Sequence, residues 1–190
     1  VNALYLANDF ITKLRKVQET LRLGATQDHD YDVPYTTLHV GRIKGGGALN
    51  IVPHLCELDF EIRNLAQDDA AEILNNLTQA AKSIALEAQN IASEANIEIE
   101  VFNTYPGLDT ASNEPVVGFV KSLTGANSTI KVAYGTEGGL FDQRLGVPTV
   151  VCGPGDMAQG HKPDEFITET QLSACDAMLD NLIQRLIIGL

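Results

Sequence analysis

Basic residues are scarce in this sequence. The 13 lysines and arginines stand against 25 aspartates and glutamates, and the formal net charge at pH 7 is −12. Proteins that bind nucleic acid neutralise its phosphates with basic side chains, so this balance argues against a nucleic-acid partner. No apolar run approaches the ~20 residues of a membrane span, and no charged and apolar leader stands at Val1. The composition therefore favours a cytoplasmic protein with neither a nucleic-acid nor a membrane partner.

Cysteine is also rare, with only Cys56, Cys152 and Cys175 in 190 residues. An odd number at such wide spacing fits neither a disulfide framework nor a Cys-x-x-Cys metal site. Each cysteine falls at an apolar position of an expected helix or strand. We therefore expect all three to be core residues.

The first half of the sequence predicts an α+β domain. Apolar residues recur at three- and four-residue intervals over residues 1–23 and 68–92, which predicts two helices with one apolar stripe each. Extended patterns at residues 36–43, 56–63 and 97–101 predict strands, most sharply at 56–63, where apolar and charged residues alternate. Two helices on one face of an antiparallel sheet form an α+β sandwich, which we assign to residues 1–103. A split βαβ motif would have one more strand before the first helix.

The second half, residues 104–190, reads as a parallel α/β layer. After the boundary at Tyr105-Pro106-Gly107, we expect a helix at 114–123, a short strand at 130–133, a loop at 135–139 and a buried strand at 147–152. A last helix begins near Thr168, where Thr168-x-x-Gln171 has capping-box spacing. The sequence shows no internal repeat, low-complexity tract or nucleotide-binding glycine fingerprint.

Two loops in the second half hold residues that are able to carry chemistry. His161 follows the buried strand, and α/β enzymes place reactive groups beyond the carboxyl ends of their strands. One histidine is not a metal site, since a catalytic zinc usually has three protein ligands and a water; the alternative is a surface loop. Glu137, Gly138 and Gly139 form the other loop, where glycines let a ligand approach the backbone. The alternative there is a solvated or capping glutamate.

Two polar residues of the first half have alternative interpretations as well. Asn50 lies in a glycine-rich turn, where asparagine is common for backbone reasons. Arg63 shares a strand face with three acids and is able to form a plain surface ion pair. His29, between two aspartates, indicates a solvated acidic loop rather than a metal site. We interpret His39 and His54 as structural or solvated.

Two long stretches resemble one known family. TEGGLFDQRLGVPTVVCGPGDMAQGHKPDEF, from Thr136, resembles the C-terminal catalytic segment of the acetylornithine deacetylases. These belong to the zinc-dependent M20-type family of amidohydrolases and aminopeptidases, with the desuccinylases and aminoacylases. TLHVGRIKGGGALNIVPHLCELDFEIR, from Thr37, resembles the lid, or dimerisation, domain of that family. The resemblance implies the C-terminal portion of an α/β metalloenzyme, with an α+β lid whose first strand would precede Val1.

The resemblance also implies roles for particular residues. His161 matches the last ligand of a Zn²⁺ or Co²⁺ centre that holds one or two metal ions, while the other ligands and the catalytic glutamate would lie upstream. No catalytic acid or base is therefore expected within this segment. Arg63 matches an arginine that binds the substrate carboxylate, and Asn50, which belongs to the NxVP motif, would also be a substrate-binding residue. Glu137, with Gly138 and Gly139, would lie beside the active-site cleft and contact a substrate ammonium group.

The implied activity is hydrolysis of N-acetyl-L-ornithine to acetate and L-ornithine, a step of arginine biosynthesis, by a water that the metal activates. The partners would be a small N-acyl amino acid and a second copy of the protein, bound through the lid. Two alternatives stay open. The enzyme is another family member, such as a succinyl-diaminopimelate desuccinylase, an aminoacylase or a dipeptidase; or the chain is a non-catalytic dimerisation module. In either case we expect the segment alone to be inactive.

Overall fold

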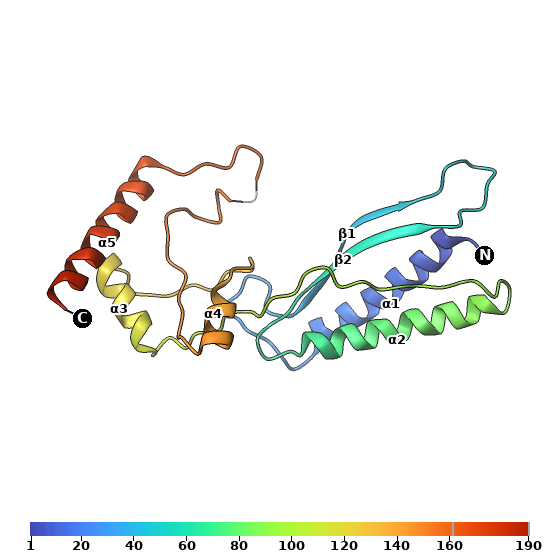
Figure 1. Ribbon diagram of the computed structural model, residues 1–190, viewed down its shortest axis with the longest axis horizontal. Helices are drawn as coiled ribbons and strands as arrows, with labels where there is room; N and C mark the ends of the chain where they lie inside the picture. The colour runs from blue at the N-terminus through green and yellow to red at the C-terminus, as the bar shows by residue number, and fades with distance from the viewer. Residues whose placement is uncertain (161, 190) are drawn as a thin grey trace. The chain divides into compact units, whose positions relative to one another are not determined.

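The computed structural model describes residues 1–160 and 162–189, and it divides into two compact units. Residues 1–104 form the first unit and residues 105–190 the second. Figure 1 shows the elements of both units.

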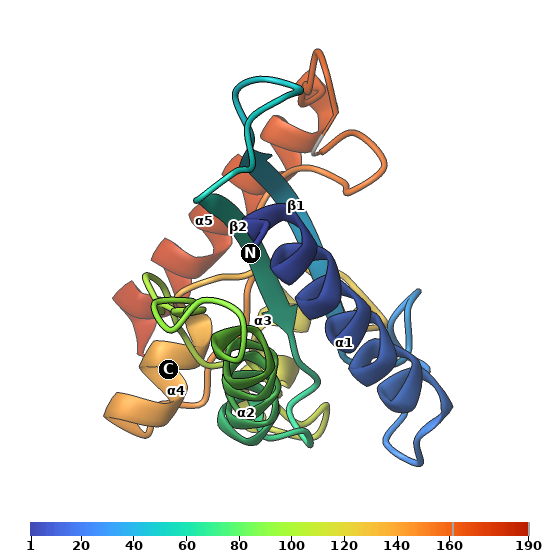
Figure 2. The same cartoon turned by 90° about the vertical axis from the view of Figure 1, so that its right-hand side faces the viewer.

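The first unit packs two long helices on one face of a β-hairpin. Helices α1 (Ala3–Leu23) and α2 (Ala70–Gln89) run alongside the antiparallel strands β1 (Thr37–Gly45) and β2 (Cys56–Arg63) (Figures 1 and 2). Both helices and both strands supply side chains to a single apolar cluster. This arrangement confirms the predicted α+β fold with two helices on an antiparallel sheet.

The predicted apolar stripes form the core of this unit. Phe10 and Leu14 of α1 are buried together with Ile73, Leu77 and Ala81 of α2. The ring of Phe10 meets the ring of Phe60 on β2 edge-on, with the centroids 5.6 Å apart. Helix α2 ends earlier than the predicted residue 92, because Ile91 lies beyond Gln89 and is 82% exposed.

Side-chain caps fix where the two helices begin. The Asn2 side chain accepts a hydrogen bond from the Leu4 N–H at 2.9 Å, and that of Asp69 accepts from the Ala71 N–H at 2.8 Å. Such caps satisfy amide groups that have no partner inside the helix. The acidic residue Asp69 therefore caps α2 from outside, whereas the sequence pattern placed it within the helix.

A β-bulge at Gly41 sets the two faces of the hairpin. Val40 pairs with Phe60 and Arg42 pairs with Asp59, so Gly41 is an extra residue on β1. The bulge shifts the alternation by one residue and turns Arg42 to the polar face. Apolar residues on both sides of it then face the helices: Leu38, Val40, Leu58, Phe60 and Ile62.

The third strand predicted for this unit, at residues 97–101, is wrong. That segment has no ladder pairing, although Ile97 and Ile99 pack against the core while Glu98 and Glu100 are exposed. Alternation decides which side chains face the core, but a strand also needs a neighbour with aligned N–H and C=O groups. The burial pattern was therefore predicted, and the hydrogen bonding was not.

The second unit contains the helices α3 (Pro115–Thr124), α4 (Gly138–Leu145) and α5 (Glu169–Ile188). Helices α3 and α5 pack together, and the Asn181 side chain donates to the Leu123 carbonyl at 3.3 Å. The capping box of Thr168 and Gln171 is present, which confirms the predicted start of α5. Gly125 ends α3 in the left-handed conformation that suits glycine.

Three expectations for this unit are wrong. Residues 130–133 and 147–152 are not strands, and Val151 and Cys152 are exposed rather than buried. Helix α4 stands partly where a loop was expected, because two glycines at its start masked the helical pattern. Apolar side chains along α5 are exposed as well, since Leu172, Leu179 and Leu186 are 44–57% exposed.

The cysteines also differ from expectation, because Cys56 and Cys175 are only half-buried and Cys152 is exposed. A β-branched run such as residues 147–152 favours a strand, but it becomes one only beside a partner strand.

Among the helices of the described residues, none combines the length and the apolar character needed to cross a membrane.

Candidate functional site

Asn50 lies in the loop that joins β1 to β2. The loop turns through a hydrogen bond from the Ile51 N–H to the Ala48 carbonyl at 3.3 Å, and Asn50 is exposed. Gly46 opens the loop with a φ of 77°, a conformation that favours glycine. Apolar residues of the same loop are exposed around Asn50, among them Leu49, Ile51 and Val52.

Arg63 ends strand β2 on the polar face of the hairpin. Its Nε donates to Oε1 of Glu61 at 2.8 Å, and the two side chains are 52% and 46% exposed. A second ion pair on this face joins Arg42 Nε to Asp59 at 2.7 Å. The ion-pairing alternative for Arg63 is thus realised in the structure.

The hairpin does not bring Asn50 and Arg63 together. The register pairs Gly45 with Cys56 at the loop end and Thr37 with Arg63 at the other end. Strand residues advance about 3.3 Å each, so the eight residues of β2 hold the two ends apart by about 20 Å. Within one copy of the unit, these two residues cannot contact one small substrate at the same time.

Gly138 and Gly139 are buried at the start of α4, and the exposed Glu137 precedes them. A Cβ on Gly139 would collide with the Pro106 carbonyl oxygen, and one on Gly138 would lie 2.9 Å from the Leu108 side chain. Residues 106–108 therefore cross the helix start so closely that only glycine fits. The space beside these two glycines is thus taken by a segment of the same unit, and an approach of a ligand to their backbone stays a prediction.

The loop before His161 is held by its own hydrogen bonds. The Asp156 side chain accepts from the Ala158 N–H at 2.7 Å, and its carbonyl accepts from the Gln159 N–H at 2.9 Å. Nζ of Lys162 donates to the Ala158 carbonyl at 2.6 Å. Oε1 of Gln159 is buried without a hydrogen-bond partner. His161, the predicted metal ligand, lies outside the described residues.

The described part of the chain does not hold a metal site by itself. No three of its histidine, cysteine, aspartate and glutamate residues are grouped so that they could bind one ion. The residues present therefore do not fit a complete Zn²⁺ or Co²⁺ centre. No catalytic step through a metal is derived from them.

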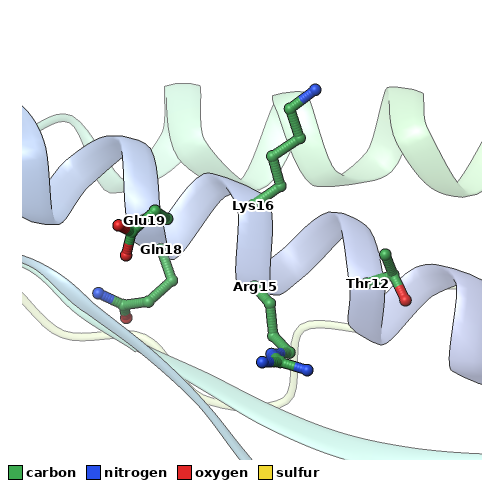
Figure 3. Close-up of a pocket in the computed structure, with 5 residues that line it drawn as sticks. All are labelled: Thr12, Arg15, Lys16, Gln18 and Glu19. Atoms are coloured by element: carbon green, nitrogen blue, oxygen red, sulfur yellow. The ribbon is translucent and has the colours of Figure 1, made fainter.

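A shallow hollow follows the surface of α1, lined by Thr12, Arg15, Lys16, Gln18 and Glu19 (Figure 3). Its side chains point in different directions around the helix, so they do not converge on a ligand. Oε1 of Gln18 accepts from the Leu38 N–H of β1 at 2.5 Å, and Glu19 pairs with Arg22 at 2.6 Å. The hydrogen bond from Arg22 lowers the pKa of Glu19. These contacts indicate a structural surface.

Sequence reasoning missed one feature of the second unit. Sγ of Cys152 lies 3.4 Å from Sδ of Met178, so the segment before the His161 loop meets α5 through two sulfur atoms. Burial raises the pKa of the Cys152 thiol, and the electrostatic interaction with Cys175 raises it further. The wide spacing of the cysteines in the sequence gave no sign of this contact.

Comparison with known proteins fits this arrangement. Residues 1–89, which contain the helix-and-hairpin unit up to the end of α2, match the family model of the M20 peptidase dimerisation domain. The first unit is therefore similar to the dimerisation domain of the M20 family. The matched residues include both helices and both strands of the first unit, so the similarity covers the α+β packing described above.

The chain is also similar to acetylornithine deacetylases through both units. An acetylornithine deacetylase of Yersinia pseudotuberculosis (serotype O:1b, strain IP 31758) is 30% identical over 183 residues, which are 96% of this chain and 45% of the relative. One from Shigella sonnei (strain Ss046) is 34% identical over 170 residues, 88% of the chain and 42% of the relative. The chain thus spans somewhat less than half the length of these relatives.

A solved structure supports the fold. The M20 family metallo-carboxypeptidase of Sulfolobus solfataricus superposes with a TM-score of 0.61 at 18% identity, covering 92% of this chain and 43% of that one. At this identity the likeness concerns the fold alone. It extends over most of the second unit as well as the first, and it agrees with the predicted class of an α+β lid joined to part of a metallopeptidase-like domain.

Proposed function

We propose that the protein containing this segment hydrolyses N-acetyl-L-ornithine to acetate and L-ornithine. The observation that carries the proposal is the similarity to acetylornithine deacetylases, which extends over 96% of the chain rather than over the dimerisation domain alone. The relatives are named deacetylases, which supports amide hydrolysis as the reaction class. The choice of acetyl as the acyl group and of ornithine as the amino acid rests on the relatives' names.

Arg63 is proposed to bind the substrate α-carboxylate. Its planar guanidinium is able to donate two parallel hydrogen bonds to a carboxylate. The carboxylate of Glu61 accepts from Nε in this structure, so the position already holds an anion of the required kind. A substrate carboxylate would replace Glu61 on the guanidinium or share it.

Glu137 is proposed to meet the ammonium group of the ornithine side chain. It is exposed at the start of α4, and the buried Gly138 and Gly139 fix the backbone beside it. Because the turn beside it is tightly packed, the carboxylate of Glu137 reaches only a limited set of positions. Asn50 is proposed to act at a site other than the one that Arg63 serves, because the two lie at opposite ends of the hairpin.

His161 is proposed as a ligand of the divalent metal that M20 metallopeptidases use, with Zn²⁺ or Co²⁺ as the candidates. The remaining ligands and the general base would come from the region that the relatives have and this segment lacks. We also propose that the protein is a homodimer through residues 1–89, as the description of the family domain implies. A cytoplasmic location and a place in arginine biosynthesis remain predictions.

A second candidate function is a dimerisation module without catalysis. It is favoured by the first unit, which has its own apolar core and matches the dimerisation domain on its own. The two functions differ in what a longer protein does, because a module would assemble without hydrolysing the substrate.

The test compares the 190-residue chain with a protein that also carries the preceding half found in the relatives. We expect the longer protein to release acetate from N-acetyl-L-ornithine when supplied with Zn²⁺ or Co²⁺, and the shorter one to be inactive. N-succinyl-diaminopimelate and a dipeptide serve as competing substrates. Preference for either one would replace the proposed substrate, and a dimeric longer protein without any hydrolysis would establish the module.

A further inference from the structure

Three sulfur-bearing residues gather beside α5, and we name Cys152, Cys175 and Met178 the sulfur cluster. Sγ of Cys152 lies 3.4 Å from Sδ of Met178. Cys175 and Met178 are three residues apart on α5, a spacing that places two side chains on the same helix face. The cluster therefore joins the segment after α4 to one face of α5.

The direction of helical side chains brings Cys152 close to Cys175. A long side chain on a helix leans toward the N-terminus and covers the turn before its own Cα. The thioether of Met178 thus lies over the turn that holds Cys175, and the thiol of Cys152 touches that thioether. An electrostatic interaction with Cys175 also raises the pKa of the Cys152 thiol, which agrees with this proximity.

We propose that Cys152 and Cys175 form a reversible intramolecular disulfide. Cys152 is exposed and Cys175 is half-buried, so a small disulfide reaches Cys152 first. Met178 cannot enter the bond, because a thioether has no proton to lose, and it acts as the apolar surface against which Cys152 rests. The inference concerns the second unit alone and does not depend on the proposed substrate.

The reaction needs an oxidant, for which we name oxidised glutathione. The Cys152 thiolate attacks one glutathione sulfur and releases one glutathione, which leaves a mixed disulfide on Cys152. The Cys175 thiolate then attacks Sγ of Cys152 and releases the second glutathione. Two protein thiols lose two protons and two electrons, and one glutathione disulfide becomes two thiols.

The bond would close a ring around the loop that carries His161. Residues 153–174 lie between the two cysteines, and among them is the whole segment from the end of the expected strand to the start of α5. Cross-linking restricts the conformations that such a segment can adopt. Intracellular disulfides of this kind are mostly transient and serve redox sensing or catalysis.

The test oxidises the folded 190-residue chain with oxidised glutathione, alkylates the remaining thiols and maps the peptides by mass spectrometry. We expect a peptide pair linked through Cys152 and Cys175, with Cys56 alkylated, and full reversal by a reductant. The same oxidation in urea is the control, because in the unfolded chain linkage of the three cysteines should lose this selectivity.

Variants separate the two steps. Cys175→Ser should accumulate the glutathione adduct on Cys152, since no second thiol resolves it, whereas Cys56→Ser should form the bond as the unchanged chain does. Stable glutathione adducts on both Cys152 and Cys175 in the unchanged folded chain, without a linked peptide, would overturn the proposal. Linkage of Cys56 to either partner at an equal yield would overturn it as well.

Discussion

The hydroxyl group of Thr36 donates to a carboxylate oxygen of Asp68 at 2.5 Å, and Thr36 is fully buried. The same hydroxyl oxygen accepts from the Leu65 N–H at 2.8 Å. One side chain thereby ties the start of β1 to the turn between β2 and α2. Asn64 closes that turn through hydrogen bonds to the carbonyls of Leu65 and Asp68. The buried Thr36 hydroxyl has a partner both as a hydrogen-bond donor and as an acceptor, so it fixes how these segments pack together.

Replacing Thr36 by valine keeps the shape of the side chain but removes both hydrogen bonds. The Leu65 N–H and the Asp68 carboxylate oxygen then lose a partner, and we expect a loss of about 1–3 kcal/mol in the free energy of unfolding. Urea unfolding followed by circular dichroism measures it. Thr20→Val is the matched control, because Thr20 is exposed and its hydroxyl only bonds to the preceding turn of its helix. Equal stability of both variants would contradict the role of Thr36.

Leu77 is the most completely buried large apolar residue of the first unit, with none of its surface exposed. Leu77→Ala leaves a cavity between α2 and the hairpin, and we expect it to destabilise the unit by about 2–5 kcal/mol. Leu86→Ala on the same helix removes an equal side chain that is 64% exposed, so its effect should stay within about 0.5 kcal/mol. A cost for Leu86→Ala as large as that for Leu77→Ala would show that the two faces of α2 are misassigned.

The sequence pattern predicts the first unit better than the second for a physical reason. In the first unit each apolar stripe finds its counterpart on a neighbouring element, so the periodicity of α1 and α2 coincides with burial. The bulge at Gly41 is also encoded, because apolar residues stand two apart at Leu38 and Val40 and then three apart at Ile43. The separation of Asn50 from Arg63 depends on the strand register, which residue patterns leave open.

In the described part of the second unit, the sequence patterns that predict strands have no neighbouring strand to pair with. The β-branched run at 147–152 has strand propensity, but it has no neighbour to pair with among the described residues. Helix α4 has low propensity at its start and forms because Gly138 and Gly139 pack beneath residues 106–108. Propensity therefore failed where tertiary contacts decide the structure. Of the candidate site, His161 lies outside the described residues, so its role stays a prediction.

The raised pKa of Cys152 predicts how its reactivity depends on pH. Burial raises this pKa first and the electrostatic interaction with Cys175 adds to it, so the thiolate is a minor species at neutral pH. Because only the thiolate reacts, alkylation of Cys152 by iodoacetamide should speed up about ten-fold per pH unit between pH 7 and 8. Because the pKa of Cys152 is raised in the folded state, the protonated thiol favours folding. Its contribution to the free energy of unfolding is complete below the pKa that Cys152 has in the unfolded chain. The contribution is lost as pH rises through the pKa that Cys152 has in the folded chain. A rate that does not change with pH would contradict the assignment.

The metal prediction concerns the number of ligands. The 190-residue chain should bind Zn²⁺ weakly in calorimetry, since one histidine cannot replace the three protein ligands of a catalytic zinc. In the longer protein, His161→Ala should remove metal and hydrolysis together, whereas His54→Ala, in the exposed β1–β2 loop, should leave both unchanged. Full metal occupancy and rate in the His161 variant would make it an ordinary loop residue.

The carboxylate role of Arg63 is tested in the longer protein by Arg63→Lys, which keeps the charge and removes the planar fork. Lysine still pairs with Glu61, so a purely structural ion pair, worth about 0–1 kcal/mol when exposed, tolerates the change. A carboxylate clamp does not tolerate it. The loss of charge-assisted hydrogen bonds worth about 1.5–3 kcal/mol would lower kcat/KM about ten- to a hundred-fold.

The hairpin supplies a matched control in Arg42, which lies on the same polar face and pairs with Asp59 at 2.7 Å. Arg42→Lys makes the same chemical change at a second exposed ion pair, and we expect kcat/KM to stay near that of the unchanged protein. Steady-state kinetics with an analogue whose carboxylate is a neutral amide completes the test. The amide should lose less from Arg63→Lys than the acid does, because an amide offers no anionic pair of oxygens to the fork. If Arg63→Lys and Arg42→Lys discriminate equally between acid and amide, Arg63 pairs with Glu61 and does not bind the substrate.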